Sequence, residues 1–188
     1  MRLIFFPLLL TLSIILYSKP LISGEENKPS STTESFEHWV VICNSVKNSQ
    51  NEVNDSDNML CEIKTSVSVK EQNGNIRSLL SINIGQMPGE EDLTILFQVP
   101  PGVFLRSDVM LHQIEGEQLK DQPLLNASYF RCDKNQCLAD TTLTEDMLDV
   151  MTAEKQFQTL FVDAGFNRIG VPISMDGFKG ALSSLLSK

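Results

Sequence analysis

The sequence predicts an all-β fold, an antiparallel β-sandwich or barrel-like domain with one short internal helix and a C-terminal helix. Short runs of apolar and β-branched residues recur along the chain, and turn-forming residues separate them. Helical spacing of apolar residues is confined to two segments. Parallel α/β folds alternate strands with helices. The many short strands with regular turns therefore favour a sandwich or barrel over a parallel sheet.

The first predicted strands are rich in β-branched residues or alternate between apolar and polar positions. His38–Cys43 is apolar and β-branched. Leu60–Lys70 alternates, with Ile63, Thr65, Val67 and Val69 on one face, and Ser78–Gln86 repeats the alternation. Asn73-Gly74 lies between these two segments and is a hairpin signal, because both residues tolerate the positive φ of a tight turn. The sequence therefore predicts a strand followed by a β-hairpin.

The second half of the chain predicts further strands. Leu93–Val99 is a short apolar run that ends at Pro100-Pro101-Gly102. Val103–Ile114 is predicted to form a strand pair or one bent strand. The remaining predicted strands are Ser128–Cys132, Leu138–Leu143, Gln156–Val162 and Ile169–Met175.

Two segments carry helical signals. Thr142 to Met151 begins with the spacing of a capping box, in which Thr142 would cap the helix and Glu145 would reach back to it. A second helix is predicted after Asp176-Gly177, with Asp176 as the N-cap. Its apolar residues follow i, i+3, i+4, i+7, i+8 spacing and are Phe178, Ala181, Leu182, Leu185 and Leu186. We expect this helix to pack on the sheet, and a partner-binding helix is the alternative.

The N-terminus has the composition of a signal peptide, predicted over residues 1–24. Arg2 precedes the apolar run Leu3–Tyr17, which is shorter than the ~20 residues of a membrane-spanning helix. Small residues at Ser18, Ser23 and Gly24 offer cleavage points, although none completes a small-x-small site. An uncleaved membrane tether is the alternative interpretation. We expect no stable membrane span after cleavage.

Residues 25–35 are polar and predict a flexible linker, because they contain nothing apolar to bury. The folded part is then predicted over 36–188 as a single domain, a length that suits one sizeable core. The whole chain has a formal net charge of −9. Loss of residues 1–24 removes Arg2 and Lys19 and no acidic residue, so −9 becomes −11. Such a charge repels phosphate backbones and argues against nucleic-acid binding.

The four cysteines are Cys43, Cys61, Cys132 and Cys137. An even number behind an export signal is typical of disulfides in an oxidising compartment. Four cysteines allow three pairings. Cys132 and Cys137 flank a short polar turn and are easily bridged, which leaves Cys43 with Cys61. Redox catalysis is the rival interpretation, but thiol oxidoreductases typically use C-x-x-C, and these two cysteines are separated by four residues.

Signals for catalysis or metal binding are sparse. The sequence has no G-x-S-x-G, H-E-x-x-H or P-loop motif. His38 and His112 lack the spacing of zinc ligands, and we expect both to be structural. The acidic clusters Glu90-Glu91-Asp92 and Asp55-Ser56-Asp57 lack the glycine and spaced oxygens of a calcium loop. We therefore expect no catalytic residues, no metal site and no cofactor.

Four segments, in order, resemble the invasion-associated locus B family of bacterial exported proteins. Trp39–Cys43 is similar to the family's opening W-x-V-x-C, and Pro101–Leu105 to its central P-x-G-V-x-L. Phe130–Cys132 with Cys137–Ala139 is similar to its F-x-C…C-x-A hairpin. Ile173–Phe178, followed by Ala181-Leu182, resembles its closing I-S-L-x-G-F-x-x-A-L. Together these segments span roughly residues 36–186.

The resemblance implies an exported protein of the periplasm, outer surface or medium, linked to invasion of host cells and notably of erythrocytes. The family supplies no established catalytic residues. We expect a non-enzymatic virulence-associated protein that binds an unknown host-cell or envelope protein, with the Asn44–Leu60 loop as a contact region. The alternative is a periplasmic envelope-stability or chaperone-like binding module. An enzyme that uses His38 or His112 with carboxylates is the third hypothesis.

Overall fold

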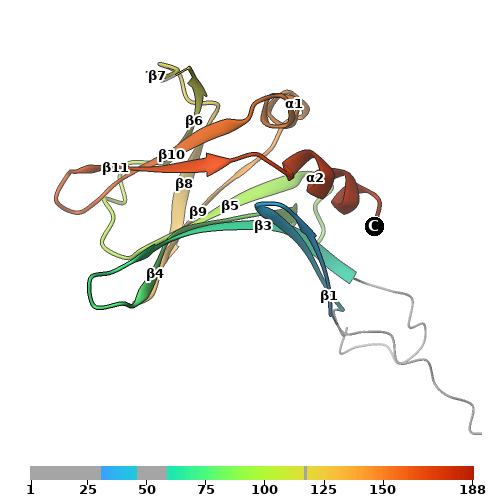
Figure 1. Cartoon of the computed structure of the whole chain (residues 1–188), viewed down its shortest axis with the longest axis horizontal. Helices are drawn as coiled ribbons and strands as arrows, with labels where there is room; N and C mark the ends of the chain where they lie inside the picture. The colour runs from blue at the N-terminus through green and yellow to red at the C-terminus, as the bar shows by residue number, and fades with distance from the viewer. Residues whose placement is uncertain (1–30, 46–58, 117) are drawn as a thin grey trace, which may run out of the picture.

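The strands form one continuous antiparallel sheet that does not close on itself. The computed structural model describes residues 31–45, 59–116 and 118–188 (Figure 1). Within these residues the strand order is β1-β2-β3-β4-β5-β9-β8-β6-β10-β11, with β7 beside β6. The strands are β1 (Ser31–Phe36), β2 (Trp39–Ser45), β3 (Met59–Lys70), β4 (Ile76–Gln86), β5 (Leu93–Val99), β6 (Val109–Glu115), β7 (Gln118–Leu119), β8 (Leu125–Cys132), β9 (Cys137–Thr142), β10 (Gln156–Val162) and β11 (Arg168–Ser174).

Strand β8 joins the two parts of this sheet. Leu125–Ala127 pairs with β6, whereas the segment from Ser128 to Cys132 pairs with β9. Residues of β10 and β11 belong to the same buried cluster as residues of β4 and β5. The sheet therefore packs against itself around one core, as the all-β sandwich-like prediction requires.

Alternation places one side of each strand in the core. Val41 on β2 lies opposite Ile63 on β3, which lies opposite Ile84 on β4, and all three are buried. Ile95 on β5 continues the row. Directly opposite residues in an antiparallel pair share a face, so the residues next to this row, such as Ile42, Glu62 and Gly85, lie on the other, outer face.

The linker prediction fails for residues 31–35. These residues form most of β1, which pairs with β2 from Ser31↔Asn44 to Phe36↔Trp39. Every position of β1 is exposed or half-buried, because this strand lies at the edge of the sheet. Backbone pairing rather than apolar burial therefore orders this segment. Residues 1–30, including the predicted signal peptide, lie outside the described residues.

The central segment also differs from its prediction. Only Val109–Glu115 of the expected Val103–Ile114 strand forms β6. Val103 makes an isolated bridge to Asp163. Residues 104–108, between Val103 and β6, form turns, a bend and irregular backbone. Gly102 has φ +87°, so the chain turns sharply just after Pro100-Pro101. The hairpin predicted at Asn73-Gly74 is confirmed, because β3 and β4 pair from Lys70↔Ile76 onward.

Helix α1 (Glu145–Ala153) has a different cap from the one predicted. The N-cap is Thr144, whose hydroxyl accepts a hydrogen bond from the backbone N–H of Met147 at 3.3 Å. Thr142 belongs instead to β9 and pairs with Thr94. The capping box from Thr142 to Glu145 is therefore wrong, because strand pairing holds Thr142 in extended conformation.

Helix α2 (Phe178–Leu186) also begins differently. Its N-cap is Gly177, with φ +89° and no side-chain cap, whereas the Asp176 carboxylate accepts a hydrogen bond from the Ser174 hydroxyl. A side chain at Gly177 would overlap the carbonyl of Phe36. Glycine therefore allows α2 to approach β1 closely. The helix packs on β1, β2 and β3, as the apolar spacing predicted (Figure 1).

None of the helices in the described ranges has the length and apolar character needed to cross a membrane.

Candidate functional site

Both predicted disulfides are present. Cys43–Cys61 joins β2 to β3, and Cys132–Cys137 joins β8 to β9. In each pair the two cysteines lie directly opposite one another, with Cα atoms 4.0 Å apart. The disulfides therefore fix the register of two strand pairs, and no described cysteine is free.

The turn inside the second disulfide is held by one carboxylate. Asp133 Oδ1 accepts hydrogen bonds from the backbone N–H groups of Asn135 at 2.7 Å and Gln136 at 3.1 Å. These bonds stabilise the carboxylate and lower the pKa of Asp133. The turn needs no partner outside the hairpin, which is the behaviour of a structural staple.

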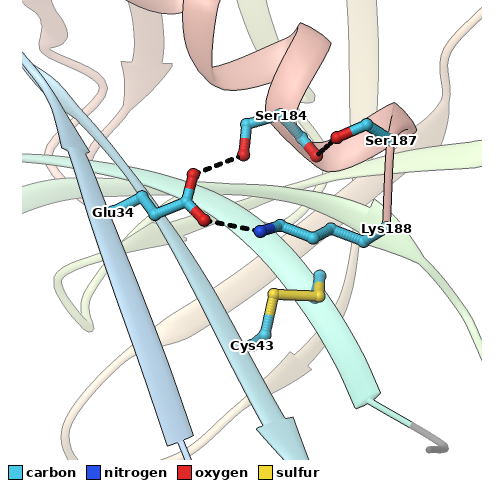
Figure 2. A network of polar contacts seen from close by, with 6 residues as sticks. Glu34, Cys43, Ser184, Ser187 and Lys188 are labelled. Carbon is cyan, nitrogen blue, oxygen red and sulfur yellow. Dashed lines mark hydrogen bonds and ion pairs between the residues drawn. A yellow bond between two sulfur atoms is a disulfide. The ribbon is translucent and has the colours of Figure 1, made fainter.

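The C-terminal helix is fastened to β1 above the other disulfide. Figure 2 shows the Glu34 carboxylate between Ser184 and Lys188 of the C-terminal segment, with the Cys43 disulfide nearby. The Lys188 ammonium is the main cause of a lowered Glu34 pKa, and the Ser184 hydroxyl, at 2.7 Å, adds to it. This network fastens the C-terminal end of the chain to β1.

The outer face of β2 to β5 carries the most distinctive polar arrangement in the described residues. One row across the strands runs from Ile42 through Glu62 and Gly85 to Thr94. Gly85 has no side chain, so the row has a gap between Glu62 and Thr94. A Cβ there would lie only 3.0 Å from the Cys61 carbonyl oxygen. The strand register therefore builds a hollow into this face.

The hollow is a cavity of about 230 Å³. It is smaller than the roughly 300–1,000 Å³ typical of small-molecule pockets, so it suits one side chain better than a cofactor. The lining residues come from β2, β3, β4, β5 and the turn after β4, and they are Asn44, Leu60, Cys61, Glu62, Asn83, Gly85, Gln86, Met87, Pro88, Thr94 and Leu96.

Thr94 is one buried polar residue of this cavity, and Asn83 is the other. Asn83 is 7% exposed, and its Nδ2 donates to Glu62 Oε2 at 2.7 Å. Its Oδ1 is buried and has no hydrogen-bond partner among the described residues. Buried carbonyl oxygens are almost always paired, because an unpaired one loses its bond to water without replacement. Asn83 Oδ1 has less than 1 Å² of accessible surface, so it is an unpaired acceptor that solvent in the cavity does not reach.

The two histidines do not form a catalytic pair with carboxylates. His38 is exposed in the turn between β1 and β2, and its carbonyl accepts from the Thr65 hydroxyl at 2.8 Å. His112 is buried on β6, with Nδ1 2.9 Å from the Lys120 carbonyl oxygen. Its Nε2 has no described partner. Within the described part of the chain, neither imidazole hydrogen-bonds a carboxylate.

The acidic clusters gather no metal-binding group in the described ranges. Glu90-Glu91-Asp92 is exposed in the connection between β4 and β5. Asp55-Ser56-Asp57 lies outside the described residues, as does most of the Asn44–Leu60 loop predicted as a contact region.

Glu62, Asn83 and Gly85 were not identified from the sequence. Asn83 is a polar residue inside the buried strand segment Leu80–Ile84, which is a usable signal. The contact of Asn83 with Glu62, and the position of Gly85 beside them, depend on the register in which β3 pairs with β4. That register cannot be read from either segment of sequence alone.

An open antiparallel sheet, two cross-strand disulfides and a covering C-terminal helix define a disulfide-stapled all-β protein. The family model described as "Invasion associated locus B (IalB) protein" matches residues 39–186, so the chain belongs to the invasion-associated locus B family. The four resembling segments lie at β2, at the β5–β6 connection, at the β8–β9 hairpin and at the β11–α2 junction.

A solved structure has the same fold. It is the crystal structure of invasion associated protein B from Bartonella henselae, with a TM-score of 0.62 and 16% sequence identity. The match covers 84% of this chain and 96% of that one. No curated protein matches the chain.

Proposed function

We propose that this chain is an exported, non-enzymatic virulence-associated protein that contributes to invasion of host cells, erythrocytes among them, by binding a host or envelope component. Membership of the invasion-associated locus B family is the observation that carries the proposal. The Bartonella henselae protein of similar fold is itself named an invasion associated protein.

Export is supported by two independent features. Residues 1–24 have the composition of a signal peptide, and all four cysteines are paired in disulfides. Structural disulfides persist in oxidising compartments and are rare in the reducing cytoplasm. We place the mature protein in the periplasm, on the outer surface or in the medium.

A binding role accords better with the geometry than a catalytic role does. The described histidines lack carboxylate partners, and the hollow beside Glu62 and Asn83 has the size of a side chain. General acid–base catalysis needs titratable groups within hydrogen-bond reach of one another or of substrate. A sheet face with a small hollow, lined by both apolar and polar side chains, offers instead a surface for recognition.

The test combines localisation with infection. In the native organism, we would fractionate cells and treat intact cells with protease, using an antibody to the mature chain. A deletion strain and its complemented strain would then be compared for adhesion to erythrocytes and for invasion. Surface exposure or release, with adhesion lost on deletion and restored by the gene, is the expected result.

Strict periplasmic retention, with normal adhesion of the deletion strain, would overturn the host-contact proposal. An invasion defect accompanied by sensitivity to detergents would then favour the envelope-stability or chaperone-like module. Sensitivity to detergents serves as the control, because it reports envelope damage without any host cell.

A further inference from the structure

One end of the sheet gathers four connections between strands. They are the β3–β4 turn, the β5–β6 connection, the β8–β9 turn and the β10–β11 turn. The antiparallel pairing of these strands brings all four to the same end. Figure 1 shows the β3–β4 and β10–β11 turns projecting on the side of the molecule away from α2. We call this region the loop end, and it comprises residues 69–77, 100–108, 130–137 and 163–168.

The loop end exposes a large share of the apolar side chains on the surface. Nine large hydrophobic residues are exposed in the described ranges. Five of them belong to the loop end, and these are Val69, Ile76, Leu105, Phe130 and Phe166. Single exposed apolar residues are ordinary on protein surfaces, whereas a group of them in one region marks an interaction site. The loop end is therefore a candidate interaction surface.

Leu105 and Phe166 are exposed on two connections that contact each other. Val103 forms a bridge to Asp163, which joins the β5–β6 connection to the β10–β11 turn. The ring of Phe104 lies beside the ring of Phe166, with centroids 5.0 Å apart. Leu105, the next residue after Phe104, is 59% exposed, and Phe166 is 70% exposed. The two exposed side chains therefore belong to one pair of packed loops.

The backbone of Phe166 adopts a conformation that disfavours a bulky side chain. Its φ is +65°, in the left-handed region that glycine and asparagine usually occupy. The turn is held by Asp163, whose carboxylate accepts hydrogen bonds from the Asn167 backbone N–H at 2.8 Å and from the Asn167 side-chain amide at 2.9 Å. A phenylalanine here costs free energy, although most of its surface stays in water. Such costs are typical of positions that serve a function.

The loop end is basic although the chain as a whole is acidic. It holds six basic and four acidic residues, which give a formal side-chain charge of +2. The basic residues are Lys70, Arg77, Arg106, Arg131, Lys134 and Arg168. The other described residues include five basic and fourteen acidic ones, which give −9. An anionic surface would repel the rest of the molecule and attract this end, so the charge distribution orients the loop end toward such a surface.

The cations beside the exposed apolar residues are unpaired. Arg106, Lys134 and Arg168 are exposed, and none of them forms an ion pair or a side-chain hydrogen bond with another described residue. Arg106 directly follows Leu105, and Arg168 comes two residues after Phe166. At an anionic membrane, apolar side chains enter the boundary of the acyl chains, while neighbouring cations meet the lipid phosphates. The loop end offers both kinds of group together.

We propose that the loop end docks on an anionic phospholipid membrane. Leu105 and Phe166 enter the interface, and Arg106 and Arg168 contact the lipid phosphates. A soluble polyphosphate would engage the arginines but would leave the apolar side chains in water. A bilayer satisfies both, because its phosphates lie next to its hydrocarbon region. The inference rests on the proposed function, in which the chain binds a host or envelope component, and it names that component as membrane lipid.

The test uses lipid vesicles and the mature chain from Glu25 onward, with both disulfides formed. Vesicles of phosphatidylcholine with about one third phosphatidylglycerol are the anionic probe, and pure phosphatidylcholine vesicles are the neutral one. Cosedimentation measures the partition of the protein. We expect partition into the anionic vesicles to be at least about tenfold stronger than into the neutral ones, and to weaken as salt is raised.

A tryptophan variant reports which residue enters the membrane. Phe166→Trp adds an indole at the exposed turn, whereas Trp39 is fully buried and supplies a constant background. Emission of the added indole should shift to the blue on anionic vesicles and should be quenched by lipids brominated on their acyl chains. Leu186→Trp, at an exposed position of α2, is the control and should show neither effect. The same response from both variants would overturn the assignment to the loop end.

The apolar contribution is tested by the double variant Leu105→Ser/Phe166→Asn. Asparagine suits the left-handed φ of residue 166, so the turn should be retained. We expect partition into anionic vesicles to fall about tenfold or more, because both inserted side chains are lost. Thermal melting reports whether the variant is folded. Undiminished binding by the folded variant would overturn the proposal.

The charge contribution is tested by Arg106→Gln/Arg168→Gln, which should also weaken partition about tenfold or more. Lys155→Gln/Lys179→Gln makes the same change of net charge at exposed positions outside the loop end. This control should bind like the wild type. Equal losses in the two double variants would show that net charge, and not contact by the loop end, governs binding, and would overturn the proposal.

Failure of the wild type to bind anionic vesicles would overturn the proposal, as would equal binding to both kinds of vesicle. Loss of adhesion to erythrocytes in the Leu105→Ser/Phe166→Asn variant, without lipid binding by the wild type, would assign the loop end to a protein partner instead. Because the vesicles contain no host protein, these outcomes are distinct from failure of the adhesion experiment, which tests the proposed function itself.

Discussion

The indole ring of Trp39 meets the ring of Phe178 edge to face, with centroids 4.9 Å apart and ring planes at 61°. Both side chains are fully buried. The Trp39 Nε1–H also donates to the Ser174 carbonyl at 3.0 Å, so the indole has both an apolar and a polar partner. This contact joins the start of β2 to the start of α2, which are the opening and closing motifs of the family.

Phe178→Ala should therefore lower the free energy of unfolding by about 3–5 kcal/mol, because it removes a buried ring and leaves a cavity. Chemical denaturation monitored by Trp39, the only tryptophan, measures the change directly. Leu186→Ala, at a helix position that is 67% exposed, is the control and should cost less than about 1 kcal/mol. Similar losses for the two variants would contradict the anchoring role of Phe178.

The two disulfides should differ in their effect on stability. Replacing Cys43 and Cys61 by serine opens a loop of 18 residues, and the chain-entropy model gives a loss of about 3 kcal/mol. The same change at Cys132 and Cys137, with a separation of 5, should cost about 2 kcal/mol. Chemical denaturation of the two double variants under the same conditions measures the loss of unfolding free energy in each. An equal or reversed order would show that strand packing outweighs loop closure.

Much of the fold is predictable because the alternating apolar residues of β3 and β4, such as Ile63, Ile82 and Ile84, are those that enter the core. Strand β1 was not predicted, because burial of side chains contributes little to it. Its residues, Ser31–Phe36, bury no side chain fully, and its order comes from backbone pairing with β2 and from the contact of Glu34 with α2. The composition of residues 31–36 does not reveal partners that lie far away in the sequence.

The cavity escaped prediction for a related reason. Glu62 and Asn83 are 21 residues apart, and they meet on one face only because β3 and β4 pair in a particular register. Shifting that register by one residue would move Asn83 to the other face. The disulfide pairing was predictable because Cys132 and Cys137 are near neighbours in sequence, and the remaining pair followed by elimination.

The cap of α1 allows the corrected helix boundary to be tested. Thr144→Ala should lower the free energy of unfolding by about 1 kcal/mol, because the Met147 N–H loses its hydroxyl acceptor. Thr144→Ser keeps the hydroxyl and should restore most of the loss. If Thr142→Ala destabilised the helix through lost capping instead, the capping box predicted from the sequence would regain support. Thermal melting with far-UV circular dichroism follows all three variants.

Tyr129 should titrate far above an ordinary tyrosine. Burial of the phenol raises its pKa to about 12, and the nearby Asp108 charge adds to the shift. Because the folded pKa exceeds the usual value of 10.0, the stability that the neutral phenol contributes is complete below pH 10 and is lost as pH rises toward 12.

The measurement is the phenolate absorbance of a chain that begins at Glu25, in which Tyr129 is the only tyrosine. The expected midpoint is about 12 in the folded protein and about 10 after denaturation. A midpoint near 10 in the folded protein would show that the phenol is solvated, contrary to its buried hydroxyl.

Glu34 should contribute to acid sensitivity through the C-terminal contact. Its pKa is lowered from 4.5, chiefly by the Lys188 ammonium and then by the Ser184 hydroxyl, so its stabilising effect is present above pH 4.5 and is lost as pH falls below it. Glu34→Gln should therefore be less stable than the wild type at neutral pH, with the difference shrinking below pH 4.5. Melting temperatures from pH 7 to pH 3 measure this, and Glu90→Gln in the exposed β4–β5 turn is the control.

The Glu34–Lys188 pair is solvent-exposed, so 1 M salt should reduce the difference at neutral pH. A difference that stays constant across this pH range would mean that the Glu34 charge does not fasten α2 to β1.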